Sequence, residues 1–366
     1  MLEKSLQVSL FGNFSYEKWR SPSMERYFWH LEKGLIQKGV DVKAVQPTLP
    51  IQYKFLPSKY QFRFARFHYY PSFAKQKQSS INHITDQSYA QVAKYLDLNR
   101  TIITCHDLIP LFYEKGASSL RNFRESVSYL SKVRLVLADS EETKKDLEGL
   151  LKIDSSKIRV VYLGVGENFQ PSTEENVKIF KEKYSLPHKP LLLHLGNNLA
   201  YKNMEKILLS LRILNQKGID FCFLKVGSDF TLEQKELIRE YKLGDSIKFL
   251  GVVSENLMSD LYSSTDLLVY PSLKEGFGFP VLEMLACGGV VLISKGTSLE
   301  EIASLAGVYV DPNKPEDIAR GIEEVLNMKE KEKDKLRRLG LERAKQFTWE
   351  KTINQVYNYY LEILHA

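Results

Sequence analysis

Short apolar runs rich in β-branched residues alternate with amphipathic helical stretches along most of this 366-residue chain. Such alternation is typical of βαβ units, in which a crossover helix returns the chain so that the next strand runs parallel to the last. It predicts strands at residues 6–11, 40–46, 81–85, 101–105, 135–139, 158–163, 191–196, 221–226, 247–250, 267–270, 290–293 and 308–310. It also predicts helices at 24–38, 141–151, 204–216, 315–328 and 349–364. The chain is therefore expected to be an α/β protein with two doubly wound, Rossmann-like domains.

The length of the chain by itself suggests two domains, because 366 residues are too many for one ordinary core. Residues 164–171 also contain two glycines and a proline, which favour a connection rather than an element. We expect an N-terminal domain at 1–170 and a C-terminal domain at 171–349, with the helix of residues 350–366 packing back on the first domain. Ligands of doubly wound sheets bind at the carboxyl ends of the strands, so a cleft between the two domains is the expected site.

The net charge of +6 is unevenly distributed. Residues 1–170 hold 25 Lys and Arg against 17 Asp and Glu, which suggests an anionic partner for that half. The three cysteines lie far apart without a C-x-x-C pair, so neither a disulfide framework nor a zinc site is indicated, and a reducing cytoplasm fits. The sequence has no run of 18 apolar residues and no apparent signal peptide, which favours a protein that is soluble or bound peripherally to a membrane.

One segment carries most of the chemical information. A strand is followed by a loop with Gly276 and Gly278, and Pro280 stands where a helix is expected to begin. Backbone N–H groups that glycines leave unobstructed at a helix start bind pyrophosphate. Glu275 precedes the loop, and Glu283 follows eight positions later, in the expected first turn. Carboxylates accept hydrogen bonds from hydroxyls, so one can hold a sugar and the other a ribose, although Glu283 alone would equally complement the helix dipole.

The spacing from Glu275 to Glu283 matches the E-x7-E motif of retaining glycosyltransferases of the GT-B fold, in particular family 4. Further segments resemble that family in the expected order, at residues 104–110, 138–140, 161–165, 196–203 and 346–349. Each segment is a weak signal, but six in order, with the E-x7-E motif, are a strong one. The resemblance implies the GT-B architecture, with two Rossmann-like domains facing across a cleft. It also implies transfer of a sugar from a nucleotide-sugar to an acceptor, with retention of configuration and without a metal ion or other cofactor.

The resemblance also implies functional residues. Those that bind the donor are Gly12, Gly196, Asn197, Lys202, Gly276, Phe277, Gly278, Phe279 and Glu283, and the catalytic residues are His106 and Glu275. The family often has an arginine at the position of Asn197, so Lys202 is expected to carry most of the charge neutralisation at the β-phosphate. The alternative for Lys202 is a solvated lysine at a helix start. Asn203 is expected to be the N-cap of the following helix rather than a ligand.

In the first domain, His106 follows a predicted strand and is implied to contact the transferred sugar. The alternative is a structural hydrogen-bonding pair, and Asp107 is the expected supporting neighbour. The loop after the first strand departs from the family, which usually has paired glycines there, because only Gly12 is present. We expect Gly12 to allow close approach of a phosphate and Arg26 to face the acceptor, with the polar loop adapted to that acceptor.

Residues 51–77 contain six Lys or Arg and nine aromatic residues, but no acidic residue. One interpretation is an acceptor-side docking surface that contacts the inner face of a membrane, where basic residues contribute about 1 kcal/mol each. The other is that the aromatic side chains fill the core of the first domain while the charges are solvated. A single-stranded nucleic acid would also suit this composition, but the site motifs argue against that partner.

Other classes fit the sequence less well. The loop after the first strand lacks G-x-G-x-x-G, no Gly-Lys pair indicates a P-loop, and no Asp-x-Asp indicates a metal-dependent glycosyltransferase. A basic-aromatic binding module would leave the site motifs unexplained. An epimerase or a phosphorylase of the GT-B fold stays open. The predicted function is hexose transfer, of mannose or glucose type, from a GDP- or UDP-sugar to a glycan or lipid-linked acceptor in the cytoplasm.

Overall fold

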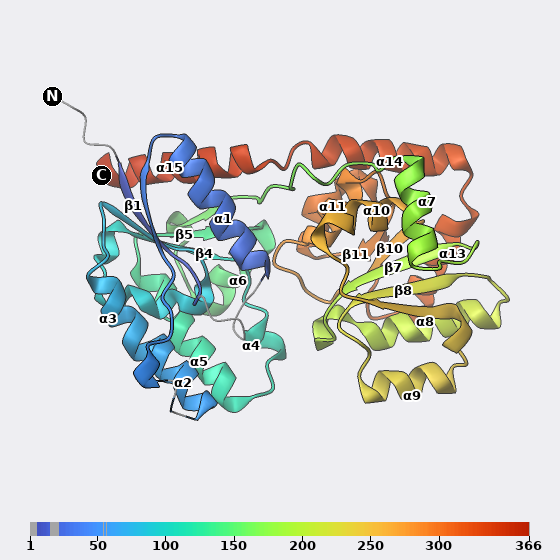
Figure 1. The fold of residues 1–366 in the computed structure, drawn as a ribbon, viewed down its shortest axis with the longest axis horizontal. Helices are drawn as coiled ribbons and strands as arrows, with labels where there is room; N and C mark the ends of the chain where they lie inside the picture. The colour runs from blue at the N-terminus through green and yellow to red at the C-terminus, as the bar shows by residue number, and fades with distance from the viewer. Residues whose placement is uncertain (1–5, 15–21, 54, 56, 366) are drawn as a thin grey trace. The chain divides into compact units, whose positions relative to one another are not determined.

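The computed structural model describes residues 6–14, 22–53, 55 and 57–365. The chain divides into two compact units. The first comprises Met1–Gly164 together with Thr348–Ala366, and the second comprises Val165–Phe347. Each unit is built around a six-stranded sheet whose paired strands are all parallel (Figure 1).

The sheet of the first unit has the strand order β2-β1-β3-β4-β5-β6. Its strands are β1 (Gln7–Phe11), β2 (Asp41–Val45), β3 (Ile81–Ile84), β4 (Thr101–Cys105), β5 (Leu135–Ala138) and β6 (Ile158–Val160). Each was predicted, and β6 ends three residues before its predicted end. Every residue of β3, β4 and β5 is buried. Strands covered on both faces are apolar almost throughout, which is why these runs are visible in the sequence.

The helices of the first unit cover both faces of this sheet, with α1 and α15 on one face and α3 and α5 on the other (Figure 1). They are α1 (Pro22–Gln37), α2 (Ser58–Phe64), α3 (Tyr70–Lys75), α4 (Pro110–Tyr113), α5 (Ala117–Val127), α6 (Glu141–Leu151) and α15 (Trp349–His365). The helices α1 and α15 approach closely, because a Cβ atom on Gly34 would lie 2.1 Å from Cδ1 of Ile353. A larger residue at position 34 would therefore push the C-terminal helix away from α1.

The second sheet has the strand order β12-β11-β10-β7-β8-β9. Its strands are β7 (Leu191–Gly196), β8 (Cys222–Gly227), β9 (Ile247–Gly251), β10 (Leu267–Tyr270), β11 (Val291–Ser294) and β12 (Gly307–Val310). The helices are α7 (Glu174–Lys183), α8 (Met204–Gln216), α9 (Leu232–Glu240), α10 (Met258–Ser263), α11 (Phe279–Ala286), α12 (Ser298–Ala303), α13 (Pro315–Asn327) and α14 (Glu330–Ala344). These six strands were also predicted, with bounds within one residue of those observed.

The strand order reverses between β7 and β10, which are neighbours in the second sheet although β8 and β9 separate them in sequence. At such a switch point the loops that follow the two strands diverge to opposite faces, and the space at their carboxyl ends is the usual ligand site. The loop after β7 begins at Asn197, and the loop after β10 begins at Pro271. The topology therefore brings the two sequence segments with the strongest motifs to one edge of one sheet.

The segment of residues 51–77 forms α2, a π-helical turn (Ala65–Tyr69) and α3. Its aromatic side chains divide into two groups. Phe67 and Tyr70 are buried in the core, whereas the side chains of Phe55 and Tyr60 are 86% and 54% exposed. The core-filling interpretation is therefore right for some of these rings and wrong for others. Among the described residues, the chain has no helix that is both long and apolar enough to cross a bilayer.

Candidate active site

Lys202 and Glu275 form a buried ion pair in the second unit. Nζ of Lys202 lies 2.7 Å from Oε1 of Glu275 and 2.5 Å from the hydroxyl oxygen of Tyr270. Both charged side chains are only 9% exposed. Lys202 comes from the turn Ala200–Lys202 after β7, and Glu275 comes from the loop after β10, so the switch point brings them together. The interpretation of Lys202 as a solvated lysine is therefore wrong.

The helix α11 begins at Phe279, one residue before the expected Pro280. Its N-cap is Gly278, whose left-handed φ of 106° favours glycine, and a Cβ atom there would lie 2.4 Å from Cδ2 of Leu299. Because the helix begins earlier than expected, Glu283 lies beyond the first turn, and its prediction as a first-turn residue was wrong. Oε2 of Glu283 instead accepts a hydrogen bond of 2.7 Å from the hydroxyl of Tyr262.

The loop between Glu275 and α11 is held from several sides. The hydroxyl of Ser298 in α12 donates to the carbonyl oxygen of Glu275 at 2.9 Å. The ring of Phe277 is buried and packs edge-to-face on Phe279, with ring centroids 5.4 Å apart. Gly276 lies between these two anchored points. Packing and hydrogen bonds therefore fix the loop that carries the backbone N–H groups before α11.

Asn203 was expected to be the N-cap of α8, and this is confirmed. The residue occupies the N-cap position with a left-handed φ of 62°, but its side chain makes no capping hydrogen bond. Nδ2 donates instead to the carbonyl oxygens of Pro271 and Pro312, at 3.0 and 2.6 Å. Asn203 therefore ties together the loops that follow β7, β10 and β12. Asn197, by contrast, is exposed, and its Oδ1 accepts from the backbone N–H of Leu199 at 3.2 Å.

A second lysine, which the sequence analysis missed, is buried next to this site. Lys225 in β8 is fully buried, and its Nζ donates to the carbonyl oxygens of Gly196 and Val226 at 2.6 and 3.2 Å. Burial lowers the pKa of Lys225 to about 8. His194 lies opposite it in the register of β7 and β8, and Nε2 of this histidine has no hydrogen-bond partner among the described residues. A lysine inside the apolar run of residues 221–226 was the available signal.

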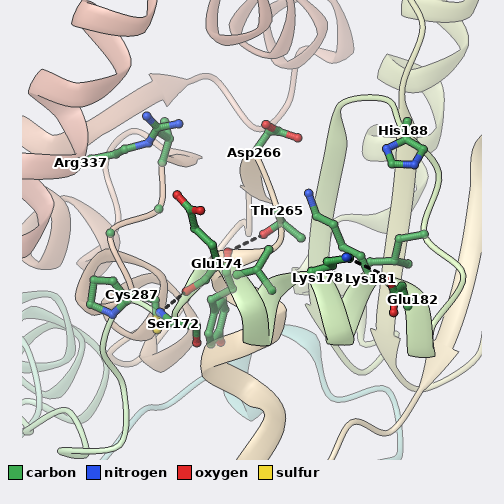
Figure 2. Close-up of a pocket in the computed structure, with 18 of the residues that line it drawn as sticks. Ser172, Glu174, Lys178, Lys181, Glu182, His188, Thr265, Asp266, Cys287 and Arg337 are labelled. Atoms are coloured by element: carbon green, nitrogen blue, oxygen red, sulfur yellow. Dashed lines mark hydrogen bonds and ion pairs between the residues drawn. The ribbon is translucent and has the colours of Figure 1, made fainter.

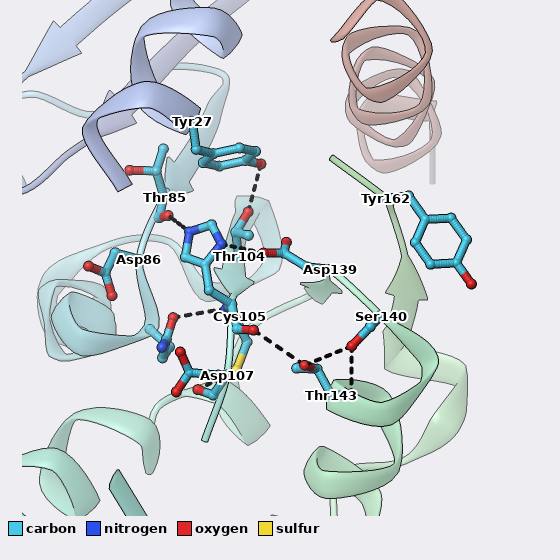
Figure 3. A network of polar contacts seen from close by, with 12 residues as sticks. Tyr27, Thr85, Asp86, Thr104, Cys105, Asp107, Asp139, Ser140, Thr143 and Tyr162 are labelled. Carbon is cyan, nitrogen blue, oxygen red and sulfur yellow. Dashed lines mark hydrogen bonds and ion pairs between the residues drawn. The ribbon is translucent and has the colours of Figure 1, made fainter. Parts of the chain in front are cut away.

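In the first unit, the ring of His106 is bound on both sides, by Asp139 and Thr85, which are labelled in Figure 3. Nδ1 lies 2.6 Å from Oδ2 of Asp139, and Nε2 lies 2.8 Å from the carbonyl oxygen of Thr85. Since both partners only accept, both ring nitrogens donate, which describes an imidazolium. Burial lowers the pKa of His106, but the charge and hydrogen bond of Asp139 outweigh it and raise this pKa to about 9.

This geometry favours the interpretation of His106 as one member of a structural pair, since the side chain is only 3% exposed and both nitrogens are occupied. The observed partner is Asp139, at the end of the neighbouring strand β5, rather than the adjacent residue. Oδ1 of Asp107 accepts from the backbone N–H of Ile109 at 2.9 Å, which stabilises the turn before α4. The signal for Asp139 was present, because it lies within the motif segment 138–140.

A chain of hydrogen bonds lies beside this pair in the first unit. The hydroxyl of Tyr27 in α1 lies 2.9 Å from Oγ1 of Thr104 (Figure 3). The same Oγ1 lies 2.8 Å from Nε2 of His83. Nδ1 of His83 lies 2.6 Å from the hydroxyl of Tyr360 in α15. The ring of Tyr27 also packs edge-to-face on His106, with ring centroids 5.0 Å apart. The network therefore joins the first and last helices of this unit to the centre of its sheet.

The remaining predicted residues of the first unit are Gly12 and Arg26. A Cβ atom on Gly12 would lie 2.7 Å from the ring of Phe28, so packing against α1 already requires a glycine here. The hydroxyl of Tyr70 donates to the carbonyl oxygen of Gly12 at 2.6 Å. Arg26 lies in α1 and is partly exposed. Residues 15–21 of the predicted acceptor loop lie outside the described residues.

A cavity of about 810 Å³ lies at the opposite edge of the second sheet from these motifs (Figure 2). Asp266 and Val290, which immediately precede β10 and β11, belong to its lining. None of the predicted donor residues lines this cavity. Tyr262 and Cys287 link its lining to Glu283, through the hydroxyl of Tyr262 and the backbone N–H of Cys287. The size of the cavity therefore does not make it the candidate site, which lies at the carboxyl ends of β7 and β10.

Two family models match successive parts of the chain. The model described as Glycosyl transferases group 1 matches residues 176–346, and the model described as Glycosyltransferase Family 4 matches residues 24–168. A serotype-specific mannosyltransferase of Escherichia coli is 28% identical over 278 residues, which cover 73% of this chain but only 34% of that protein. The O-antigen chain mannosyltransferase B of Escherichia coli is 28% identical over 277 residues, which cover 72% of this chain and 70% of that protein.

The sucrose-phosphate synthase of Thermosynechococcus elongatus has a similar structure, with a TM-score of 0.77 and 19% identity over 98% of this chain and 99% of that chain. This likeness confirms the predicted fold class, the GT-B fold with two Rossmann-like domains. The two family models between them span both units, and they confirm the resemblance drawn from the motifs. The chain therefore belongs to the group 1 glycosyltransferases of family 4.

Proposed function

We propose that this enzyme transfers a hexose from a nucleoside diphosphate sugar to a glycan or lipid-linked acceptor, with retention of anomeric configuration. The observation that carries the proposal is the buried pair of Lys202 and Glu275, beside the start of a helix that bears Glu283. Mannose is the first sugar to test, because the two relatives described above are mannosyltransferases. A uridine donor with a glucose-type sugar is the alternative.

The donor diphosphate is assigned to Lys202 and to the backbone N–H groups before α11. An ammonium group has three N–H donors, and Glu275 and Tyr270 accept two of those of Lys202. The third N–H is available to a phosphate oxygen without breaking the pair. Preorganised donors of this kind stabilise the charge that develops on a leaving phosphate. Lysine and backbone dipoles supply the neutralisation, so the proposed transfer needs no metal ion.

The two carboxylates take different roles in this proposal. Glu275 orients the hexose through its hydroxyl groups, and Glu283 holds the ribose. Oε2 of Glu283 accepts a hydrogen bond from Tyr262, which orients the carboxylate that we assign to a ribose hydroxyl. The leaving diphosphate accepts the proton of the acceptor hydroxyl. His106 acts as a positioning residue, because its bonds to Asp139 and Thr85 hold the carboxyl ends of β3, β4 and β5 in place.

The experiment that tests this function is a donor screen that follows release of nucleoside diphosphate in the presence and absence of acceptors. The proposal expects release only with an acceptor, and it expects Lys202→Ala to abolish it. Lys206→Ala is the matched control, because Lys206 lies exposed in the same region, in α8. Conversion of the nucleotide-sugar without an acceptor would identify an epimerase instead. Dependence on free phosphate would identify a phosphorylase.

Contact with the inner face of a membrane is a further part of the proposal. Its support is the exposure of Ile51, Phe55 and Tyr60 around α2, because exposed apolar and aromatic side chains settle at the headgroup level. The test is co-sedimentation with anionic and neutral vesicles at low and high salt. A Phe55→Ser/Tyr60→Ser variant is expected to bind less, and Trp29→Ser in α1, another exposed aromatic, is the control. Equal sedimentation of all three proteins would exclude this surface.

A further inference from the structure

A cavity of about 400 Å³ lies in the first unit, at the amino-terminal edge of its sheet. Residues at the starts of β5 and β6 form much of its wall, and the end of α15 closes one side. His106 and Asp139 follow the carboxyl ends of β4 and β5, at the opposite edge of the same sheet. The cavity is therefore separate from the hydrogen-bond network around His106.

The lining of this cavity is strongly basic. Lys132, Arg134, Lys157 and Arg159 all belong to it, and Glu362 is the one acidic residue among the described residues that line it. None of these four cations forms an ion pair within the described part of the chain. Like charges that share one concave site repel each other, and a bound anion relieves that repulsion.

Hydrogen bonds to backbone carbonyl groups already hold two of these side chains, those of Arg159 and Lys157. Nη1 of Arg159 donates to the carbonyl oxygens of Ser156 and Ile158 at 2.8 and 3.0 Å. Nζ of Lys157 donates to the carbonyl oxygen of Ser131 at 3.2 Å. A guanidinium has five N–H donors and an ammonium has three, so both groups keep donors for a ligand. Because these contacts already order the two side chains, ligand binding costs less side-chain entropy.

Arg134 differs from Lys157 and Arg159 in its side-chain contacts. Its backbone N–H is fixed by the carbonyl oxygens of Leu98 and Thr101, at 2.9 and 3.1 Å. Its guanidinium makes no hydrogen bond to any described residue. Arg134 and Arg159 therefore offer two planar forks of N–H donors in one cavity. Planar forks of this kind bind phosphate oxygens in pairs, which a lysine ammonium does not.

We propose that this cavity binds a multiply charged phosphate group. Its volume lies at the lower end of the range for small-molecule sites, which suits a compact phosphorylated ligand or a lipid headgroup. The site accounts for the excess of Lys and Arg over Asp and Glu in residues 1–170, 25 against 17, which the proposed transfer reaction does not use. The proposal is independent of that reaction, and its test does not require activity.

The test titrates the full chain with inorganic tripolyphosphate at low salt by calorimetry. An Arg134→Gln/Arg159→Gln variant is expected to bind at least about tenfold more weakly, which corresponds to about 1.4 kcal/mol. The matched control is Arg121→Gln/Arg124→Gln, which removes the same charge from exposed positions of α5 in the same unit. The single variant Arg134→Gln, at an exposed side chain, guards against a folding defect.

Lys202→Ala separates this site from the donor site of the second unit. The proposal expects Lys202→Ala and the α5 control to retain the binding event that Arg134→Gln/Arg159→Gln weakens, and any binding of tripolyphosphate at Lys202 is a second, separate event. Loss of binding in Lys202→Ala would place the phosphate at the donor loop and overturn the proposal. Equal weakening in the cavity variant and the α5 control would overturn it too, since the anion would then respond only to net charge.

Vesicles distinguish the two sources of phosphate. Wild type and the Arg134→Gln/Arg159→Gln variant are compared on phosphatidic acid and phosphatidylcholine vesicles. A loss of phosphatidic acid binding in the variant assigns the cavity to a lipid headgroup. Unchanged vesicle binding together with lost tripolyphosphate binding assigns it to a soluble phosphate compound. If the wild type binds neither tripolyphosphate nor phosphatidic acid, the cavity is not a phosphate site.

Discussion

Nζ of Lys202 and Oε1 of Glu275 lie 2.7 Å apart, although 73 residues separate them in sequence. Their meeting depends on the adjacency of β7 and β10, which no local pattern encodes. A buried ion pair contributes little net stability, because desolvation of the two charges offsets their attraction. A ligand that contacts both groups explains the buried pair better than a contribution to stability does. We therefore assign the donor there.

Removal of one member of the Lys202–Glu275 pair is expected to destabilise the fold more than removal of both members. Lys202→Ala leaves a buried carboxylate without its cation, and loss of one member of such a pair costs about 3–5 kcal/mol of the free energy of unfolding. The double variant Lys202→Met/Glu275→Gln should recover most of that stability without recovering donor binding. Urea unfolding and donor titration measure the two effects separately. A double variant that binds donor normally would contradict the assignment of the phosphate to Lys202.

Glu283→Ala is expected to raise the Michaelis constant for the donor by about tenfold or more, because a hydrogen bond to a charged group is worth about 1.5–3 kcal/mol. Tyr262→Phe is the matched control. It removes the observed bond to Oε2 of Glu283 but leaves the carboxylate in place. Steady-state kinetics with varied donor should therefore show a smaller change for Tyr262→Phe. The same change in both variants would mean that Glu283 acts only through Tyr262.

The pair of His106 and Asp139 makes folding stability depend on pH. The pKa of His106 is raised from 6.5 to about 9, so the folded state binds the proton more tightly than the unfolded state. The stability from this pair is fully present below pH 6.5 and is lost as the pH rises through about 9. At about 1.4 kcal/mol per unit of pKa, the loss amounts to about 3 kcal/mol. We expect urea midpoints of the wild type to fall over this window.

His106→Gln is the control for this pH dependence, and its urea midpoints should fall less between pH 6.5 and 9. Lys225 acts in the opposite direction above pH 8, because burial lowers its pKa to about 8. Its effect is common to both proteins, so the difference between their slopes isolates the histidine. Parallel slopes for wild type and His106→Gln would show that this imidazole is not the titrating group.

Transfer should not require a divalent cation. The charge of the leaving diphosphate is neutralised by Lys202 and by the N–H groups before α11 in our proposal, so excess EDTA is expected to leave the rate unchanged. The measurement is nucleoside diphosphate release with and without chelator, using protein dialysed against EDTA beforehand. Loss of activity that Mn²⁺ or Mg²⁺ restores would contradict the proposed neutralisation.

The sequence predicted the strands well because both faces of each sheet are covered, so most strands are apolar runs between polar turns. Short motifs also singled out Lys202, Glu275 and Glu283, whose roles as site residues stay a prediction. The features that the sequence analysis missed depend on which strands are neighbours in the sheets. The bond from His106 to Asp139 follows from the pairing of β4 with β5, and the burial of Lys225 follows from its place between β7 and β9.

Left-handed backbone conformations explain two local features that the sequence did not predict. The left-handed conformation of Gly278 begins α11 one residue early, which moves Glu283 out of the first turn. The left-handed conformation of Asn203 turns its side chain toward neighbouring loops rather than toward the N–H groups of α8. Single-residue conformations of this kind are not encoded in hydrophobic periodicity, and Asn adopts the left-handed region more readily than most residues.

The anomeric configuration of the product tests the central claim most directly. NMR of the first product formed from GDP-mannose, or from the donor that the screen selects, reports it through the coupling constants of the anomeric carbon and proton. We expect an α-linked product from an α-linked donor, because the anomeric configuration is retained. Wild type and Lys206→Ala should form this product, and Lys202→Ala should not. A product of inverted configuration, or equal turnover by Lys202→Ala, would contradict the central claim.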